Sequence, residues 1–174
     1  MNPRIYIRTA LLTGMLTGLV CYLSVLLFYQ IGMQPLGKHF YLFMPIFAMG
    51  FTFGITYFRN YQNGGVLTTS QGLLMGLVAN FLASTFYATT LYVYLQYVND
   101  EIFVSHLKDL QNYFIQNKDA LIQQTSKEAY ETHLQSLPSV TVTTKIADNW
   151  LRCSILGLFI GVATGFFLRK QEKA

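Results

Sequence analysis

The side chains that could do chemistry in this chain are few and scattered. The histidines are His39, His106 and His133, which no short motif brings together. His106 and Asp109 share a helix face at a spacing of three residues, but a metal ion needs further ligands, and no spacing in the sequence supplies them. We therefore expect the three histidines to be solvated surface residues and the chain to bind no metal ion.

Catalytic signatures are also missing from the sequence. It lacks the H-E-x-x-H and G-x-S-x-G motifs, the Walker phosphate loop and the spacing of a zinc ribbon. Cys21 and Cys153 each lie inside an apolar run, which favours buried, reduced thiols over a disulfide or a pair of metal ligands. We expect no catalytic residues and no cofactor, and hence no enzyme.

Asn80 is the most notable polar residue within the apolar runs. Ion-coupled transport usually needs an ionisable side chain at membrane depth, and no Asp, Glu, Lys or His lies in the middle of these runs. An isolated amide in hydrocarbon forms a hydrogen bond with a neighbouring helix more often than it contacts a substrate. Asn80 is therefore predicted to make a polar contact between helices.

The elements that position these residues are long apolar segments. The 174 residues are 52% hydrophobic and only 11% charged, whereas a soluble domain has about 25% charged residues. Spans long enough to cross a bilayer are predicted at about 9–30, 40–58, 70–97 and 150–168. The predicted fold class is all-α, a single domain over 1–174 that forms an integral membrane four-helix bundle.

An extramembrane helical segment over about 99–145 is predicted between the third and fourth spans. Its first helix carries an apolar face at three- and four-residue steps: Phe103, Leu107, Leu110, Phe114 and Leu121. A second helix is predicted over 127–137, ended by Pro138, and the β-branched residues 140–144 predict an extended lead into the last span. We expect the segment to fold back onto the bundle; the alternatives are the membrane surface or a partner.

Charge is distributed asymmetrically around the spans. One side carries Arg4, Arg8, Arg59, Arg169, Lys170 and Lys173, against Glu172 alone. Residues 100–148 carry four lysines and seven acids, a net charge of −3. The positive-inside rule therefore places both termini in the cytoplasm and predicts a multi-pass protein of the inner (cytoplasmic) membrane. The basic residues form no stripe, so we expect no nucleic-acid partner.

Each predicted span carries glycines spaced four residues apart: Gly14/Gly18, Gly50/Gly54, Gly72/Gly76 and Gly157/Gly161/Gly165. This spacing lets two helices approach backbone to backbone, although glycine is also commoner in membrane helices in general. We expect these glycines to be helix-packing residues, with a partner helix in the same chain or in another copy. Residues 14–20 resemble 72–78, which leaves an internal duplication and a chance match as alternatives.

Two hypotheses for function follow. The first is a non-enzymatic structural or interaction subunit that packs against itself, as a homo-oligomer, or against another membrane protein through its glycine faces. The alternative is a small transporter or channel for a neutral or apolar solute that passes Asn80. Trp150 is predicted to anchor the last span at the interface of the lipid bilayer. The sequence identifies no small-molecule ligand.

The chain resembles a bacterial family of membrane proteins of unknown function, DUF4199. The likeness rests on Gly14/Gly18 in the opening helix, residues 65–72 (GVLTTSQG) with Gly76 after them, and Pro138 before a glycine-rich last helix that ends in Arg169-Lys170. The resemblance implies an integral inner-membrane protein with four helices. It implies no site residues, because no activity is attached to that family.

Overall fold

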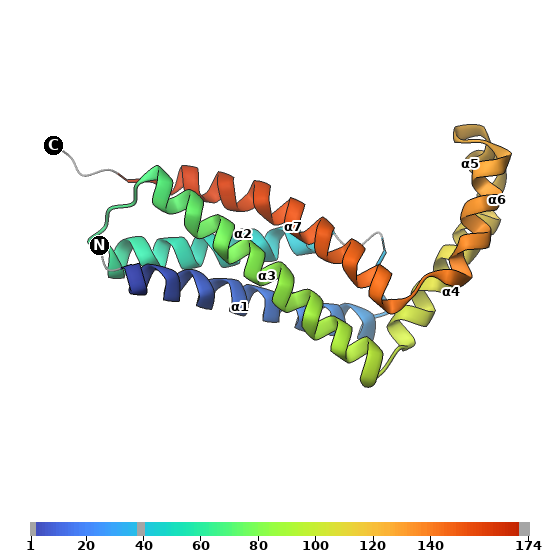
Figure 1. Ribbon diagram of the computed structural model, residues 1–174, viewed down its shortest axis with the longest axis horizontal. Helices are drawn as coiled ribbons and strands as arrows, with labels where there is room; N and C mark the ends of the chain where they lie inside the picture. The colour runs from blue at the N-terminus through green and yellow to red at the C-terminus, as the bar shows by residue number, and fades with distance from the viewer. Residues whose placement is uncertain (1–2, 38–40, 171–174) are drawn as a thin grey trace.

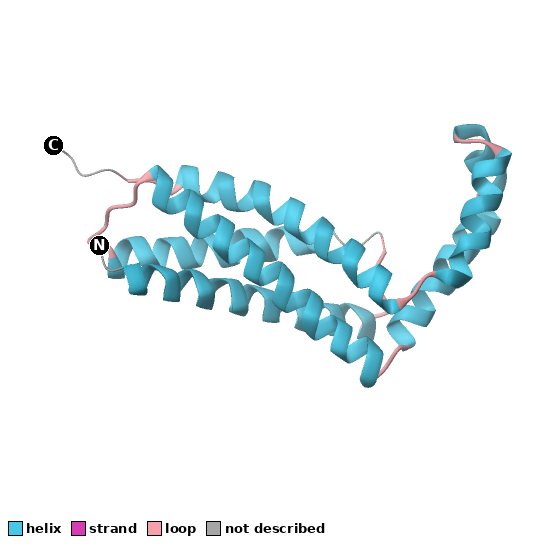
Figure 2. Cartoon of the chain, in the orientation of Figure 1, coloured by secondary structure: helices cyan, strands magenta, loops and turns pink. Residues whose placement is uncertain are grey.

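The computed structural model describes residues 3–37 and 41–170, and its regular elements are helical (Figure 2). They are α1 (Pro3–Gln30), α2 (Phe43–Tyr57), the π-helical turn η2 (Phe58–Gln62), α3 (Thr69–Tyr97), α4 (Glu101–Gln116), α5 (Lys118–Gln124), α6 (Lys127–Ser136), the 3₁₀ turn η3 (Leu137–Ser139) and α7 (Val142–Phe167). The described part of the chain contains no strand, which confirms the all-α prediction. Lys38, His39, Phe40, Glu172 and Lys173 lie outside the described residues.

Helices α1, α2, α3 and α7 lie alongside one another in an elongated bundle (Figure 1). α3 packs along both α1 and α7, and α2 packs against the same two helices on the other side. α1 begins and α7 ends at one end of the bundle, called the terminal end here. The opposite end, where α3 ends and α7 begins, is called the arm end.

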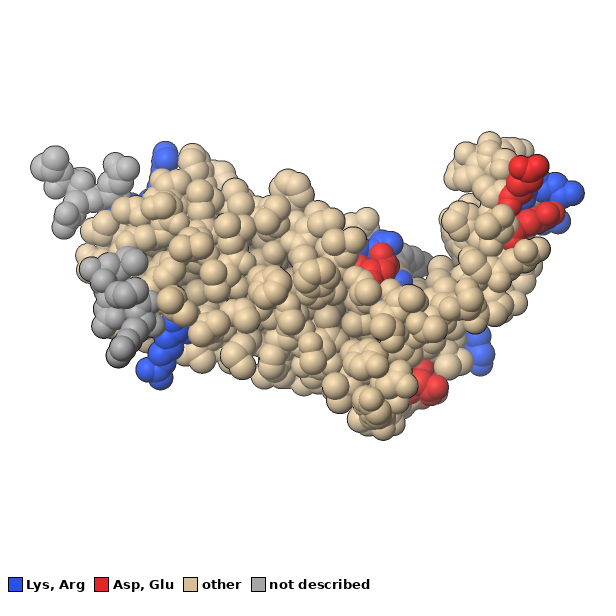
Figure 3. All heavy atoms as spheres, in the orientation of Figure 1, with Lys and Arg blue, Asp and Glu red and all other residues tan. Residues whose placement is uncertain are grey.

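Aromatic side chains fill the centre of the bundle. Phe43, Phe47 and Phe51 of α2 are fully buried. The rings of Phe43 and Tyr87 have centroids 5.4 Å apart, and those of Phe47 and Phe51 are 5.5 Å apart, edge to face. The outer faces of the same helices are apolar and exposed, and Figure 3 shows a long band without charged residues between the two ends. A helix that is apolar on all sides is typical of a membrane span.

Three helices of the described chain are long and apolar enough to cross a membrane: Ile5–Gln30, Thr69–Tyr97 and Val142–Phe167. The predicted second span, 40–58, is different. α2 has 15 residues, and these rise about 22 Å, less than the roughly 30 Å of a bilayer core. The helix continues past Tyr57 as a π-helical turn to Gln62, so its regular part is shorter than expected.

Two helices start earlier than predicted. α1 begins at Pro3 rather than near 9, and α7 begins at Val142 rather than near 150. The expected extended lead over 140–144 is confirmed for Val140 and Thr141 but wrong for residues 142–144, which are helical, because the Thr141 side chain accepts from the Thr144 amide and Thr144 bonds back in a capping box. These bonds satisfy two orphan amides, and this local gain outweighs the strand preference of β-branched residues.

Helices α4, α5 and α6 form an arm that projects from the bundle (Figure 1). Its buried apolar base consists of Ile102 and Phe103. Farther out, the ring of Phe114 lies 6.1 Å from that of Tyr130 and 6.4 Å from that of His133, both on α6. The expectation that the segment folds back onto the bundle therefore holds only for the base of α4. Beyond it, Phe114 of the apolar face packs against α6 instead.

Candidate functional site

Glycines of α3 face glycines of α7, and the two helices approach closely there. A Cβ added to Gly76 would lie 2.5 Å from the carbonyl oxygen of Gly161, and one added to Gly165 would lie 2.5 Å from the backbone of Gly72. Because these neighbouring atoms are backbone, no side chain can move aside. The absence of side chains at these positions lets the two helices touch.

The other glycine pairs also lie against helices of the same chain. An added Cβ at Gly14 or Gly18 would lie 2.6 Å from the carbonyl oxygens of Ala79 or Ala83 on α3. Gly50 and Gly54 lie against threonine hydroxyls of α1. All four pairs are thus occupied within the chain. The similar segments 14–20 and 72–78 have different partners, since the first packs on α3 and the second on α7.

Asn80 makes the polar contact between helices expected of it. Its amide nitrogen donates to the Ser154 carbonyl of α7 at 2.9 Å, and its oxygen accepts from Ser84 at 3.4 Å. The same oxygen lies directly against Gly157, so Gly157 leaves room for the amide. Both halves of the amide have partners in the fold.

Trp150 also bridges α3 and α7. Its indole nitrogen donates to the Thr85 hydroxyl at 3.2 Å, and the residue is half-buried. It lies more than two turns inside α7, because α7 begins at Val142. Its indole N–H is thus directed to another helix, a contact that a pure interface anchor does not need.

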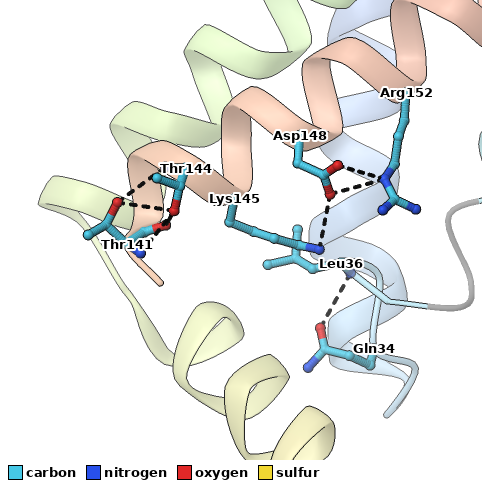
Figure 4. A network of polar contacts seen from close by, with 7 residues as sticks. All are labelled: Gln34, Leu36, Thr141, Thr144, Lys145, Asp148 and Arg152. Atoms are coloured by element: carbon cyan, nitrogen blue, oxygen red, sulfur yellow. Dashed lines mark hydrogen bonds and ion pairs between the residues drawn. The ribbon is translucent and has the colours of Figure 1, made fainter. Parts of the chain in front are cut away.

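A polar network lies at the arm end, where α7 meets the loop after α1 (Figure 4). The Asp148 carboxylate is 3.7 Å from the Lys145 ammonium and accepts from the Arg152 guanidinium at 2.9 and 3.0 Å. In the loop, the Gln34 side chain accepts from the Leu36 amide. Lys145 is largely buried although it is charged, so its pairing with Asp148 offsets part of the cost of desolvation.

His106 is buried at the base of the arm, where only 2% of it is exposed. The prediction that it is a solvated surface residue is wrong, whereas His133 is exposed. His106 lies four residues after Ile102 and three after Phe103, on the apolar face of α4. This spacing could have predicted its burial. Its Nδ1 packs near Gly37, and its Nε2 has no hydrogen-bond partner among the described residues.

Burial sets the protonation state of His106. Desolvation and the nearby Lys145 ammonium lower its pKa to about 4, against the smaller opposing effects of Asp109 and Asp148. The neutral ring is therefore the form that the fold accommodates. When the pH falls below 6.5, the ordinary pKa of histidine, His106 becomes protonated if the arm is undocked but stays neutral if the arm is docked. Protonation therefore favours the undocked arm, and the docking weakens.

A second buried polar group lies between the helices near the arm end. Tyr87 and Asn149 face each other across α3 and α7, yet neither the hydroxyl nor the amide nitrogen makes a hydrogen bond of standard geometry. Cys153 and Cys21 lie nearby, and both are free and fully buried, which confirms the prediction of buried, reduced thiols. No local pattern indicates that residues so far apart in the chain meet here.

The terminal end is closed by bonds between the α2–α3 connection and α7. The Arg59 guanidinium donates to the Leu168 carbonyl at 3.0 Å, which places a cation at the negative end of the α7 dipole. Leu67 and Lys170 exchange two backbone hydrogen bonds of 2.8 and 2.9 Å. These contacts join the C-terminal end of α7 to the start of α3.

A groove of about 970 Å³ runs along the outside of α1 and α2. Its floor includes Thr13 and Thr17, and its walls include Leu16, Met49 and Phe53. Sequence reasoning missed the groove because it depends on how far apart the two helices pack. No Cys, Ser, His, Asp or Glu lines it, and in the described residues no three His, Cys, Asp or Glu side chains are grouped to bind a metal.

Comparison with known proteins gives one match. A family described as "Protein of unknown function (DUF4199)" matches residues 12–170, a range that includes most of α1, all of the arm and α7. No curated protein and no solved structure matches the chain.

Proposed function

The chain belongs to the DUF4199 family, and we propose that it is an integral membrane protein whose four bundle helices all span the bilayer. The length and hydropathy of α1, α3 and α7 support three of the spans. α2 supports the fourth span because it packs between α1 and α7 and its 15 residues are apolar, although they are fewer than in the other three.

The proposed orientation has the terminal end of the bundle in the cytoplasm. Arg59, Arg169 and Lys170 lie at this end, whereas the arm contains most of the acids. The positive-inside rule then places the arm outside, on the far side of an inner membrane. A tag inserted after Lys118 should be accessible in spheroplasts, whose inner membrane is intact and whose outer membrane is opened, and its protection there would refute this orientation.

Within this membrane, the protein serves as a non-enzymatic interaction subunit. The observation that carries the proposal is the arm, which extends away from the bundle. The glycine faces, in contrast, already pack against other helices of the same chain. Tyr113 and Ile115 on α4 are 53% and 58% exposed. Tyr130 of α6 packs against Phe114 of α4 and so supports this helix. The arm can therefore present apolar side chains to another protein.

The test is photo-crosslinking in native membranes with a reactive amino acid at Ile115. The control position is Leu74, which is 52% exposed on α3 of the bundle. We expect a discrete adduct with a second protein or a second copy from Ile115 and none from Leu74. A monomer alone from both positions, together with solute flux in liposomes that contain only this chain, would overturn the proposal in favour of a transporter.

A further inference from the structure

The groove between α1 and α2 has the length of one leaflet of a bilayer. It runs from Ile5 to Val20 on α1, a rise of about 22 Å. A bilayer with its headgroups is about 40–45 Å thick, so one leaflet is about 20–22 Å. The groove also begins at the terminal end of the bundle, where a headgroup would lie, and ends near the middle of α1.

The terminal end of the groove carries a positive charge, that of Arg8. Arg8 lines the groove there and is exposed, and it makes no hydrogen bond or ion pair with any described residue. Tyr61 and Gln62 line the same end. A guanidinium binds phosphate oxygens through parallel N–H donors, and tyrosine rings are typical of the headgroup level.

The rest of the groove is apolar. Leu12, Leu16, Met49 and Phe53 form its walls. The hydroxyl of Thr17 is already used in the fold, since it donates to the Thr13 carbonyl at 2.8 Å. The groove volume of about 970 Å³ lies near the upper limit for ligand sites.

We propose that this groove binds one anionic phospholipid of the leaflet on the terminal side, with its phosphate at Arg8 and an acyl chain along Leu16 and Phe53. A lipid fits better than a transmembrane helix from a second copy, because the glycines that would admit a close helix, Gly50 and Gly54, are already covered by Thr17 and Thr13. The inference rests on the proposed membrane insertion but not on the proposed role of the arm.

The test is native mass spectrometry of the detergent-purified chain titrated with phosphatidylglycerol or phosphatidylcholine. We expect one phosphatidylglycerol to bind in preference to phosphatidylcholine. Arg8→Gln should lower the phosphatidylglycerol affinity about fivefold, because one cation at the membrane surface is removed, and should lower the phosphatidylcholine affinity less, because choline neutralises the charge of that phosphate. Arg169→Gln is the matched control, since Arg169 is exposed at the same end but does not line the groove.

A second pair of variants tests the acyl part. Leu16→Trp fills the groove with an indole, and Leu16 is 60% exposed, so the core is left unchanged. We expect it to lower binding of both lipids, whereas Leu23→Trp, on α1 beyond the groove, should lower neither.

Equal affinities of the wild type for the two lipids would overturn the inference, as would equal losses in Arg8→Gln and Arg169→Gln or in the two tryptophan variants. A crosslinking result that refutes the role of the arm would leave these affinities unchanged.

Discussion

Replacing Gly76 by alanine tests whether α3 and α7 are held together by direct backbone contact. The added Cβ would lie 2.5, 2.8 and 3.0 Å from the carbonyl oxygen, carbonyl carbon and Cα of Gly161. Every one of these atoms is backbone, so the helices themselves must separate. Bringing the nearest distance to the 3.4 Å of an ordinary contact requires a shift of about 0.9 Å.

The expected cost follows from that shift. Overpacking of a well-filled interior costs about 1–3 kcal/mol. Alanine returns about 1 kcal/mol through its higher helix propensity, so the net loss of unfolding free energy for Gly76→Ala is up to about 2 kcal/mol. Gly161, the residue on α7 that faces Gly76, is less crowded, because a Cβ on Gly161 would lie 3.0 Å from the carbonyl oxygen of Gly76. Gly161→Ala should therefore cost less than Gly76→Ala.

The assay is equilibrium unfolding in mixed micelles, followed by the fluorescence of Trp150. This is the only tryptophan in the chain, and its bond to Thr85 joins the same two helices. Gly37→Ala is the control, since its Cβ would meet nothing closer than His106 Nδ1 at 3.6 Å, and we expect no loss. Losses in Gly161→Ala as large as in Gly76→Ala, or a midpoint that depends on protein concentration, would refute the packing reasoning.

Three further predictions concern the buried polar residues. Burial lowers the pKa of His106 from 6.5 to about 4, so lowering the pH from 6.5 to 4 should weaken the docking of the arm by up to about 3 kcal/mol. Over this pH range, hydrogen exchange in α4 should become faster in the wild type but not in His106→Leu. Asn80→Ala should lower the free energy of unfolding by about 1 kcal/mol, because it removes the hydrogen bond to the Ser154 carbonyl. It should also reduce the cost of Gly157→Ala, because the amide oxygen that an added Cβ would meet is gone. If the two losses of unfolding free energy simply add in the double variant, this coupling is contradicted. Cys21 and Cys153 should react with a maleimide only after unfolding, because both are fully buried; rapid labelling of the native protein in detergent would show that the core opens.

The sequence by itself determined the helical class and the approximate position of most helices. Its hydropathy predicted a third apolar segment over 70–97, and α3 runs from Thr69 to Tyr97. Its pattern of polar residues and proline predicted a helix over 127–137, and α6 runs from Lys127 to Ser136. These features could be predicted because they depend on periodicity and on residues within a few positions of each other in the chain.

Only the tertiary structure decided which surfaces meet. The same glycine spacing recurs in every bundle helix, so spacing alone could not show that Gly76 meets Gly161 while Gly14 meets Ala79. The burial of His106 and the opening of the α1–α2 groove likewise depend on the distance and angle between helices. These are set by the sum of many weak contacts between residues far apart in the chain, and a local pattern does not contain that sum.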